Sequence, residues 1–119
     1  MFSPKKVLLY GEEPLNDETF KKYDIILFPN FEIEKLPNNS GDLIMNKNSF
    51  GEMNKDAVEN YIHHVQRCCK KYFFHMNHEK ESSTGSIDRG LINSEYPINK
   101  DLFKKLYRMY DIGHFIFHH

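Results

Sequence analysis

The chain has 119 residues, of which 39% are apolar and 28% are charged, and its net charge is −1 with the seven histidines neutral. This composition predicts one globular domain over residues 1–119 and argues against a disordered chain. The balanced charge argues against a nucleic-acid partner, and no apolar run has the length of a membrane span.

The first half of the chain predicts three short strands. The first covers residues 7–10 and is closed by Gly11. After a helix of a turn or two, a second strand at residues 23–28 is apolar at nearly every position, which is typical of a central parallel strand buried on both faces. A helical turn and a loop then lead to a third strand at residues 43–45.

The best helix is predicted over residues 54–70. Asn54 can cap it, and its apolar residues recur at three- and four-residue spacing, with polar residues on the opposite face. A further strand follows at residues 72–76. The polar stretch over residues 79–96 is interpreted as a long loop.

The C-terminal part predicts one more helix and one more strand. Asn99 is expected to cap the helix, Gly113 to break it, and residues 115–117 to form the strand. The apolar stripe of this helix would consist of Leu102, Phe103, Leu106 and Met109 or Tyr110. The complete order, with a strand–helix–strand unit in its middle, predicts an α/β fold with a mostly parallel sheet.

The two cysteines, Cys68 and Cys69, are adjacent. Neighbouring cysteines rarely bond to each other, because the small ring strains the peptide. We therefore expect reduced thiols and a cytoplasmic protein, an expectation that agrees with the absence of a signal-peptide pattern. No CxxC pattern is present, so no structural zinc site is expected.

The turn between the third strand and the long helix is the most distinctive stretch. An Asp-Leu-x-x-Asn pattern ends the strand, a Ser-Phe-x-Glu-Met run follows it, and a tyrosine lies on the helix. In this strand–turn–helix context the pattern resembles a motif of the sugar O-methyltransferases, which are S-adenosylmethionine-dependent enzymes of the Rossmann-like class. The matching residues are Asp42, Leu43, Asn46, Ser49, Phe50, Glu52, Met53 and Tyr61.

The resemblance implies a partial Rossmann-like methyltransferase sheet that corresponds to the C-terminal half of the family fold. It also implies methyl transfer from S-adenosylmethionine to a hydroxyl of a sugar or glycan acceptor. In the family, a glycine-rich loop in the N-terminal β–α units holds the cofactor. No two of the six glycines of this chain lie within four residues of each other, so we expect those units to be missing.

Within the motif, the resemblance implies cofactor-binding roles for Asn46, Asn48 and Ser49. It implies a catalytic role for Glu52, which can orient a sugar hydroxyl or deprotonate it. The structural alternative is that Asn48 and Ser49 form a turn while Glu52 interacts with the N-terminus of the following helix. Phe50 is expected to pack in the core.

The turn after the next strand carries His75, Asn77 and His78. These residues lie on the same rim as Asn46 if the two strands are parallel. Some sugar methyltransferases use a histidine as general base, and His78 is the second catalytic candidate. No spacing pairs the histidines on one helical face, so no metal site is expected.

A half sheet leaves an open strand edge and an uncovered apolar face. The chain can therefore be a truncated or split gene product, a fragment, or a degenerate remnant. As one half of a split enzyme it would need a partner with the missing N-terminal half, whereas the exposed edge alone favours self-association. A non-catalytic interaction module is the alternative from another functional class, and a small phosphate-binding protein is a weaker third because no glycine-rich cradle is present.

Overall fold

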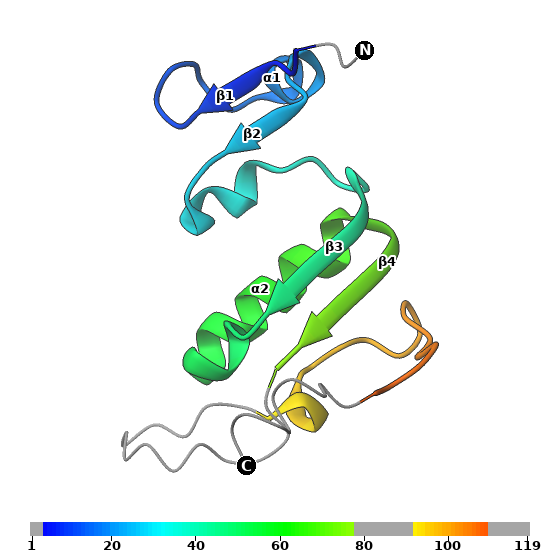
Figure 1. Ribbon diagram of the computed structural model, residues 1–119. Helices are drawn as coiled ribbons and strands as arrows, with labels where there is room; N and C mark the ends of the chain where they lie inside the picture. Colours follow the sequence, from blue (N-terminus) through cyan, green and yellow to red (C-terminus); the bar gives the residue numbers. More distant parts are fainter. Residues whose placement is uncertain (1–3, 78–91, 110–119) are drawn as a thin grey trace.

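The computed structural model describes residues 4–77 and 92–109. Two small parallel sheets form its framework, and all four arrows in Figure 1 point toward the same side. The paired strands are β1 (Val7–Leu9) with β2 (Ile25–Leu27), and β3 (Gly41–Lys47) with β4 (Cys69–Met76). The predicted α/β class and parallel pairing are confirmed, but the strands form two separate sheets rather than one.

A short helix, α1 (Asp17–Lys22), connects β1 to β2. Its N-terminus is capped by Asn16, whose side chain accepts hydrogen bonds from the backbone N–H groups of Glu18 and Thr19. Thr19 returns the contact by accepting the N–H of Asn16 at 2.9 Å, which completes a capping box. These local bonds explain why a helix of so few residues forms at the place that the sequence predicts.

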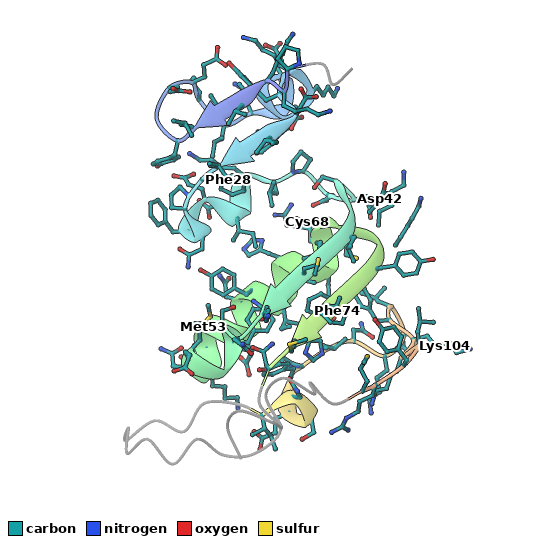
Figure 2. All side chains as sticks on the ribbon, in the orientation of Figure 1. Phe28, Asp42, Met53, Cys68, Phe74 and Lys104 are labelled. Carbon is teal, nitrogen blue, oxygen red and sulfur yellow. The ribbon has the colours of Figure 1, made fainter. Side chains whose placement is uncertain are left out.

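The long helix α2 (Lys55–Cys68) connects β3 to β4 and begins as predicted, because Asn54 accepts the N–H of Ala57 at 2.8 Å. Figure 2 shows Met53 and Cys68 at opposite ends of this helix. β4 follows directly at Cys69, so the strand expected at residues 72–76 starts earlier than predicted. The helix and both strands thus form a compact βαβ unit.

The main hydrophobic core lies between α2 and one face of the β3–β4 sheet. Its buried members are Phe50, Val58, Ile62 and Tyr96, with Met53, Tyr61, Phe73 and Ile98 packed against them. Phe50 belongs to the short helix η2 (Phe50–Glu52), directly after β3. Its ring meets those of Tyr61 and Tyr96 at centroid distances of 6.4 and 5.6 Å, so the predicted packing role of Phe50 is confirmed.

The apolar side chains on the opposite faces of both sheets are exposed. On the first sheet Val7, Leu9, Ile25 and Leu27 are between 44 and 56% exposed, and on the second Leu43, Met45 and Tyr72 are between 55 and 65% exposed. The prediction of a strand at residues 23–28 buried on both faces is therefore wrong. Within the described ranges β2 pairs with β1 alone, so a continuous apolar run does not become a central strand.

The helix predicted to begin at Asn99 is also absent from the described residues 99–109. The Asn99 carbonyl accepts the N–H groups of Leu102 and Phe103, but the chain then continues without helical structure. Phe103 reaches the Phe73 ring at 6.3 Å, whereas Leu106 stays 68% exposed. A short amphipathic helix needs a surface that buries its stripe, and the described residues cover only Phe103 in part. The strand expected at residues 115–117 lies outside the described residues.

Arg67, near the end of α2, binds the segment between the two sheets. Its guanidinium donates to the carbonyls of Leu36, Ile33 and Glu34, which follow or end the short helix η1 (Asn30–Lys35), and to Oδ1 of Asn38. Its Nε donates to Nδ1 of His64 at 3.3 Å. We call Arg67, His64 and these acceptors the Arg67 clamp, because they tie α2 to the connection between the sheets.

The clamp predicts a pH dependence of stability. Burial, followed by the charge of Arg67, lowers the pKa of His64 from its ordinary value of 6.5. Since the folded chain holds this proton less tightly than the unfolded chain, the contribution of neutral His64 is complete above about pH 6.5 and is lost as the pH falls toward the lowered pKa. We expect the urea midpoint to fall over this window.

The matched control for this pH dependence is His64→Gln. Glutamine keeps an oxygen that accepts from Arg67 but does not titrate. The fall in the urea midpoint should be smaller in this variant. An identical pH profile for both chains would contradict the role assigned to His64.

Candidate functional site

Four groups from three segments form a chain of hydrogen bonds at the carboxyl ends of β3 and β4. The backbone N–H of Phe50 donates to Oδ1 of Asn77 at 3.1 Å, and Nδ2 of Asn77 donates to Oδ1 of Asn46 at 2.9 Å. Nδ2 of Asn46 then donates to Oγ of Ser49. We call this series of hydrogen bonds the strand-end relay. Its three side chains, Asn46, Ser49 and Asn77, are all partly buried.

The parallel register of the sheet brings these residues together. Asn46 lies opposite His75, and the N–H of Asn48 donates to the carbonyl of Met76 at 2.7 Å, one step beyond the strand pairing. Asn48 has a φ of 51°, a left-handed conformation that asparagine tolerates better than most residues. It turns the chain out of β3 and into η2, which places Ser49 beside Asn46.

The structure brings together two of the residues predicted to bind the cofactor, Asn46 and Ser49. Asn48 shapes the turn but is exposed, and its side chain takes no part in the relay. The catalytic candidate Glu52 is exposed at the end of η2, and the relay forms without it. The other catalytic candidate, His78, lies outside the described residues.

His75 is paired opposite Asn46, as the parallel arrangement predicts. Its ring lies 5.3 Å from the Phe73 ring and 5.4 Å from the Tyr96 ring, centroid to centroid. These contacts place His75 against the aromatic core rather than in the polar chain. The residue of this turn that joins the site is instead Asn77.

Sequence reasoning placed Asn77 on the correct rim but did not assign it to the site, and it missed Asn93 entirely. Asn93 belongs to η3 (Asn93–Glu95), and its Nδ2 donates to the backbone carbonyl of Asn77 at 2.8 Å. Asn77 carried a usable signal, because it directly follows a strand parallel to the motif strand. Asn93 carried none, since it lies in a polar stretch interpreted as a loop.

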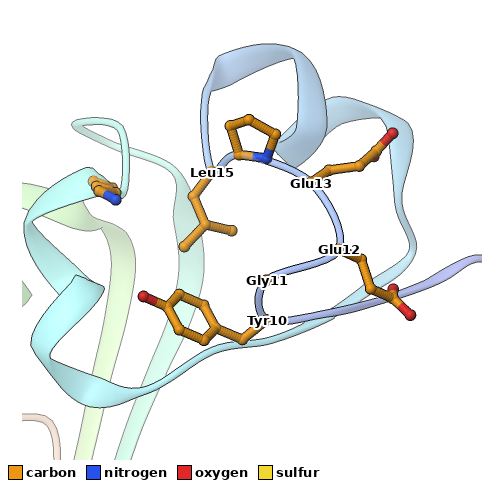
Figure 3. Close-up of a pocket in the computed structure, with 7 residues that line it drawn as sticks. Tyr10, Gly11, Glu12, Glu13 and Leu15 are labelled. Carbon is orange, nitrogen blue, oxygen red and sulfur yellow. The ribbon is translucent and has the colours of Figure 1, made fainter.

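A separate hollow of about 370 Å³ lies at the carboxyl end of β1. Its lining consists of Tyr10, Gly11, Glu12, Glu13, Pro14, Leu15 and Lys35. Figure 3 shows the Tyr10 ring and Leu15 turned toward each other, while the carboxylates of Glu12 and Glu13 point away from them. The walls of the hollow that face each other are thus mainly apolar.

Both carboxylates beside this hollow are engaged in contacts that hold the fold. Oε2 of Glu12 accepts the N–H of Leu9 at 3.0 Å. Glu13 accepts from the Tyr23 hydroxyl and from Lys22 at 3.1 Å, and these two donors hold its pKa below the ordinary value. A carboxylate stabilised as its anion in this way is a weak base, so Glu13 adds no catalytic base to the hollow.

The strand-end relay consists of neutral amides and one hydroxyl, which can bind and orient a ligand but cannot remove a proton at neutral pH. The described residues contain no group of three His, Cys, Asp or Glu side chains arranged to hold a metal ion.

Cys68 and Cys69 are free thiols, and burial raises the pKa of both, which disfavours the reactive thiolate. Among the described helices, none has the length and apolar character to cross a membrane.

Comparison with known proteins found no relative whose structure or function could be compared with this site. What the chain does must therefore be inferred from its own residues. No protein-family model matches the chain, and neither the curated proteins nor the solved structures contain a match.

Proposed function

We propose that the chain is a methyltransferase-derived α/β domain that forms the C-terminal half of an S-adenosylmethionine-dependent sugar O-methyltransferase. The observation that carries the proposal is the β3–α2–β4 unit, whose parallel strands gather Asn46, Ser49 and Asn77 at their carboxyl ends. Open α/β sheets bind their ligands at this position. The reaction class comes from the resemblance of the turn after β3 to the methyltransferase motif.

The proposed roles follow from the chemistry of each group. Asn46 and Ser49 bind and orient, because methyl transfer to oxygen requires the hydroxyl to be aligned with the sulfonium carbon. Glu52 is exposed in the next turn and is the proposed group that orients the sugar hydroxyl or takes its proton. His78 remains the second candidate for the base.

We propose that the glycine-rich cofactor loop is supplied by the N-terminal β–α units of the family fold, either in a longer form of this chain or in a partner polypeptide. The exposed apolar faces, with Leu27 at 56% and Met45 at 65%, are the surfaces that such a partner would cover. The free thiols of Cys68 and Cys69 agree with a reducing compartment, for which we propose the cytoplasm.

The first test is calorimetric titration of the 119-residue chain with S-adenosylhomocysteine, the product form of the cofactor. Because these residues lack the glycine-rich loop, we expect only weak binding at one site, weakened about tenfold further by Asn46→Ala, which removes one hydrogen-bonding side chain of the site. Asn60→Ala, an exposed change on α2, is the matched control and should leave binding unchanged. No heat from a folded sample would contradict a cofactor site in this chain.

The second candidate function is a non-catalytic interaction module that self-associates. The observation that favours it is the row of exposed Leu43, Met45 and Tyr72 on one face of the β3–β4 sheet. We expect sedimentation velocity to show concentration-dependent association, reduced by Met45→Lys but not by Asn60→Lys, which adds the same charge on α2. A monomer at every concentration would exclude self-association through this face.

A further inference from the structure

The strand-end relay has a direction that begins at the backbone. A backbone N–H can only donate, so the bond from Phe50 fixes Oδ1 of Asn77 as the acceptor and turns its Nδ2 toward Asn46. The Asn46 carbonyl must then face Asn77, and its amide nitrogen faces Ser49. Rotating the Asn46 amide by half a turn would oppose the NH₂ groups of Asn46 and Asn77, so the reverse orientation is excluded.

The direction determines what the end of the relay can offer to a ligand. Oγ of Ser49 accepts from Asn46, so its hydroxyl hydrogen is left to donate outward. One N–H of Asn46 is also unused among the described residues. Both side chains are only partly buried, so a ligand can reach them.

We infer that Asn77 is a positioning residue that makes the Asn46–Ser49 pair a hydrogen-bond donor site for an acceptor oxygen, either a carboxylate or an ether or hydroxyl oxygen. The inference rests on the proposed function in treating this strand end as a ligand site. Hydrogen bonds in a chain polarise one another, so the bonds behind Ser49 strengthen its donation. Asn77 touches no ligand in this arrangement and acts through Asn46.

The variant Asn77→Asp reverses the direction of the hydrogen bonds in the relay but keeps all of its members in contact. One carboxylate oxygen still accepts the N–H of Phe50, while the other can only accept and therefore draws the NH₂ group of Asn46. The Asn46 carbonyl then faces Ser49 and takes its hydroxyl hydrogen. The exposed end becomes an acceptor site, and the backbone keeps its contact.

The probes are acetate, a minimal acceptor, and methylammonium, a minimal donor, each titrated at constant ionic strength into the isotope-labelled chain. The readout is the NMR signals of the Asn46 side-chain amide and the Ser49 backbone. In the unaltered chain acetate should shift these signals and methylammonium should not. In Asn77→Asp the apparent affinity for acetate should fall about tenfold, while methylammonium gains a response.

Lys47→Gln is the control for charge, because it lowers the net charge by the same amount beside Asn46 and leaves the relay intact. It should keep the acetate response. A response of the unaltered chain to methylammonium, or to neither probe, would overturn the inference, and so would an unchanged acetate response in Asn77→Asp. A failed titration with S-adenosylhomocysteine leaves this result standing, because acetate tests the relay without the cofactor.

A second measurement needs no variant and covers the case in which Asn77→Asp does not fold. Couplings across hydrogen bonds should connect the N–H of Phe50 to Cγ of Asn77, and Nδ2 of Asn77 to Cγ of Asn46. A coupling from Nδ2 of Asn46 to Cγ of Asn77 would show the opposite direction and overturn the assignment.

Discussion

Replacing Arg67 by alanine is expected to lower the free energy of unfolding by about 2–4 kcal/mol, measured by urea denaturation. The guanidinium donates to Leu36, Ile33 and the side chain of Asn38, so the variant leaves several carbonyl oxygens of a partly buried segment without their charged donor. A hydrogen bond to a charged group contributes about 1.5–3 kcal/mol, and solvent exposure reduces the sum.

Two further variants separate the shape of the clamp from its charge. Arg67→Lys keeps the charge, but a single ammonium cannot reach acceptors spread along the segment, so we expect it to recover only part of the loss. Lys55→Ala removes an exposed cation whose partner Glu59 is 3.8 Å away, and it should cost less than about 0.5 kcal/mol. Equal stability of Arg67→Ala and Lys55→Ala would show that the clamp does not hold the fold.

The Arg67 clamp also contains contacts that the sequence could not predict. Arg67 lies on the face of α2 that its periodicity predicts to be polar, where a solvated side chain is the natural expectation. Apart from His64, its acceptors are carbonyls and one amide that lie 29 to 34 residues earlier in the chain. Backbone acceptors carry no residue-type signature, so no sequence pattern could identify them.

Predictions that depended on local chemistry agree best with the structure. Asn54 caps α2 by a bond to Ala57, and Phe50 is buried as expected. The helix predicted from Asn99 shows the limit of periodicity, because an apolar stripe forms a helix only where another surface buries it. The sequence shows that an apolar stripe exists, but it does not show whether another surface of the fold is present to bury that stripe.

The candidate site was predictable to the extent that it follows from parallel pairing. Asn46 and Ser49 belong to one motif, and a parallel sheet brings the end of the next strand beside them. Asn77 reaches Asn46 because β4 pairs with β3 in this register, and Asn93 reaches Asn77 from η3. The direction of the relay could not be predicted from the sequence, since it depends on which atom of each side-chain amide meets the next group.

Replacing Phe50 by alanine is expected to lower the free energy of unfolding by about 3–5 kcal/mol and to disorganise the strand-end relay. The ring is 3% exposed and packs between Tyr61 and Tyr96, so its removal leaves a cavity in the main core. The same residue supplies the N–H that orients Asn77 at 3.1 Å. Without the ring, η2 is no longer held in the core. The backbone N–H of Phe50, which orients Asn77, then moves together with η2.

The matched control is Phe31→Ala, the same truncation at a phenylalanine that is 66% exposed in η1, and it should cost less than about 1 kcal/mol. Urea denaturation measures both losses, and the side-chain amide signals of Asn46 and Asn77 report the relay. Phe50→Leu fills part of the cavity and should recover part of the stability together with the relay signals. If Phe50→Ala left those signals unchanged in the folded chain, the core and the relay would be independent, and the orientation of Asn77 would not depend on how Phe50 packs.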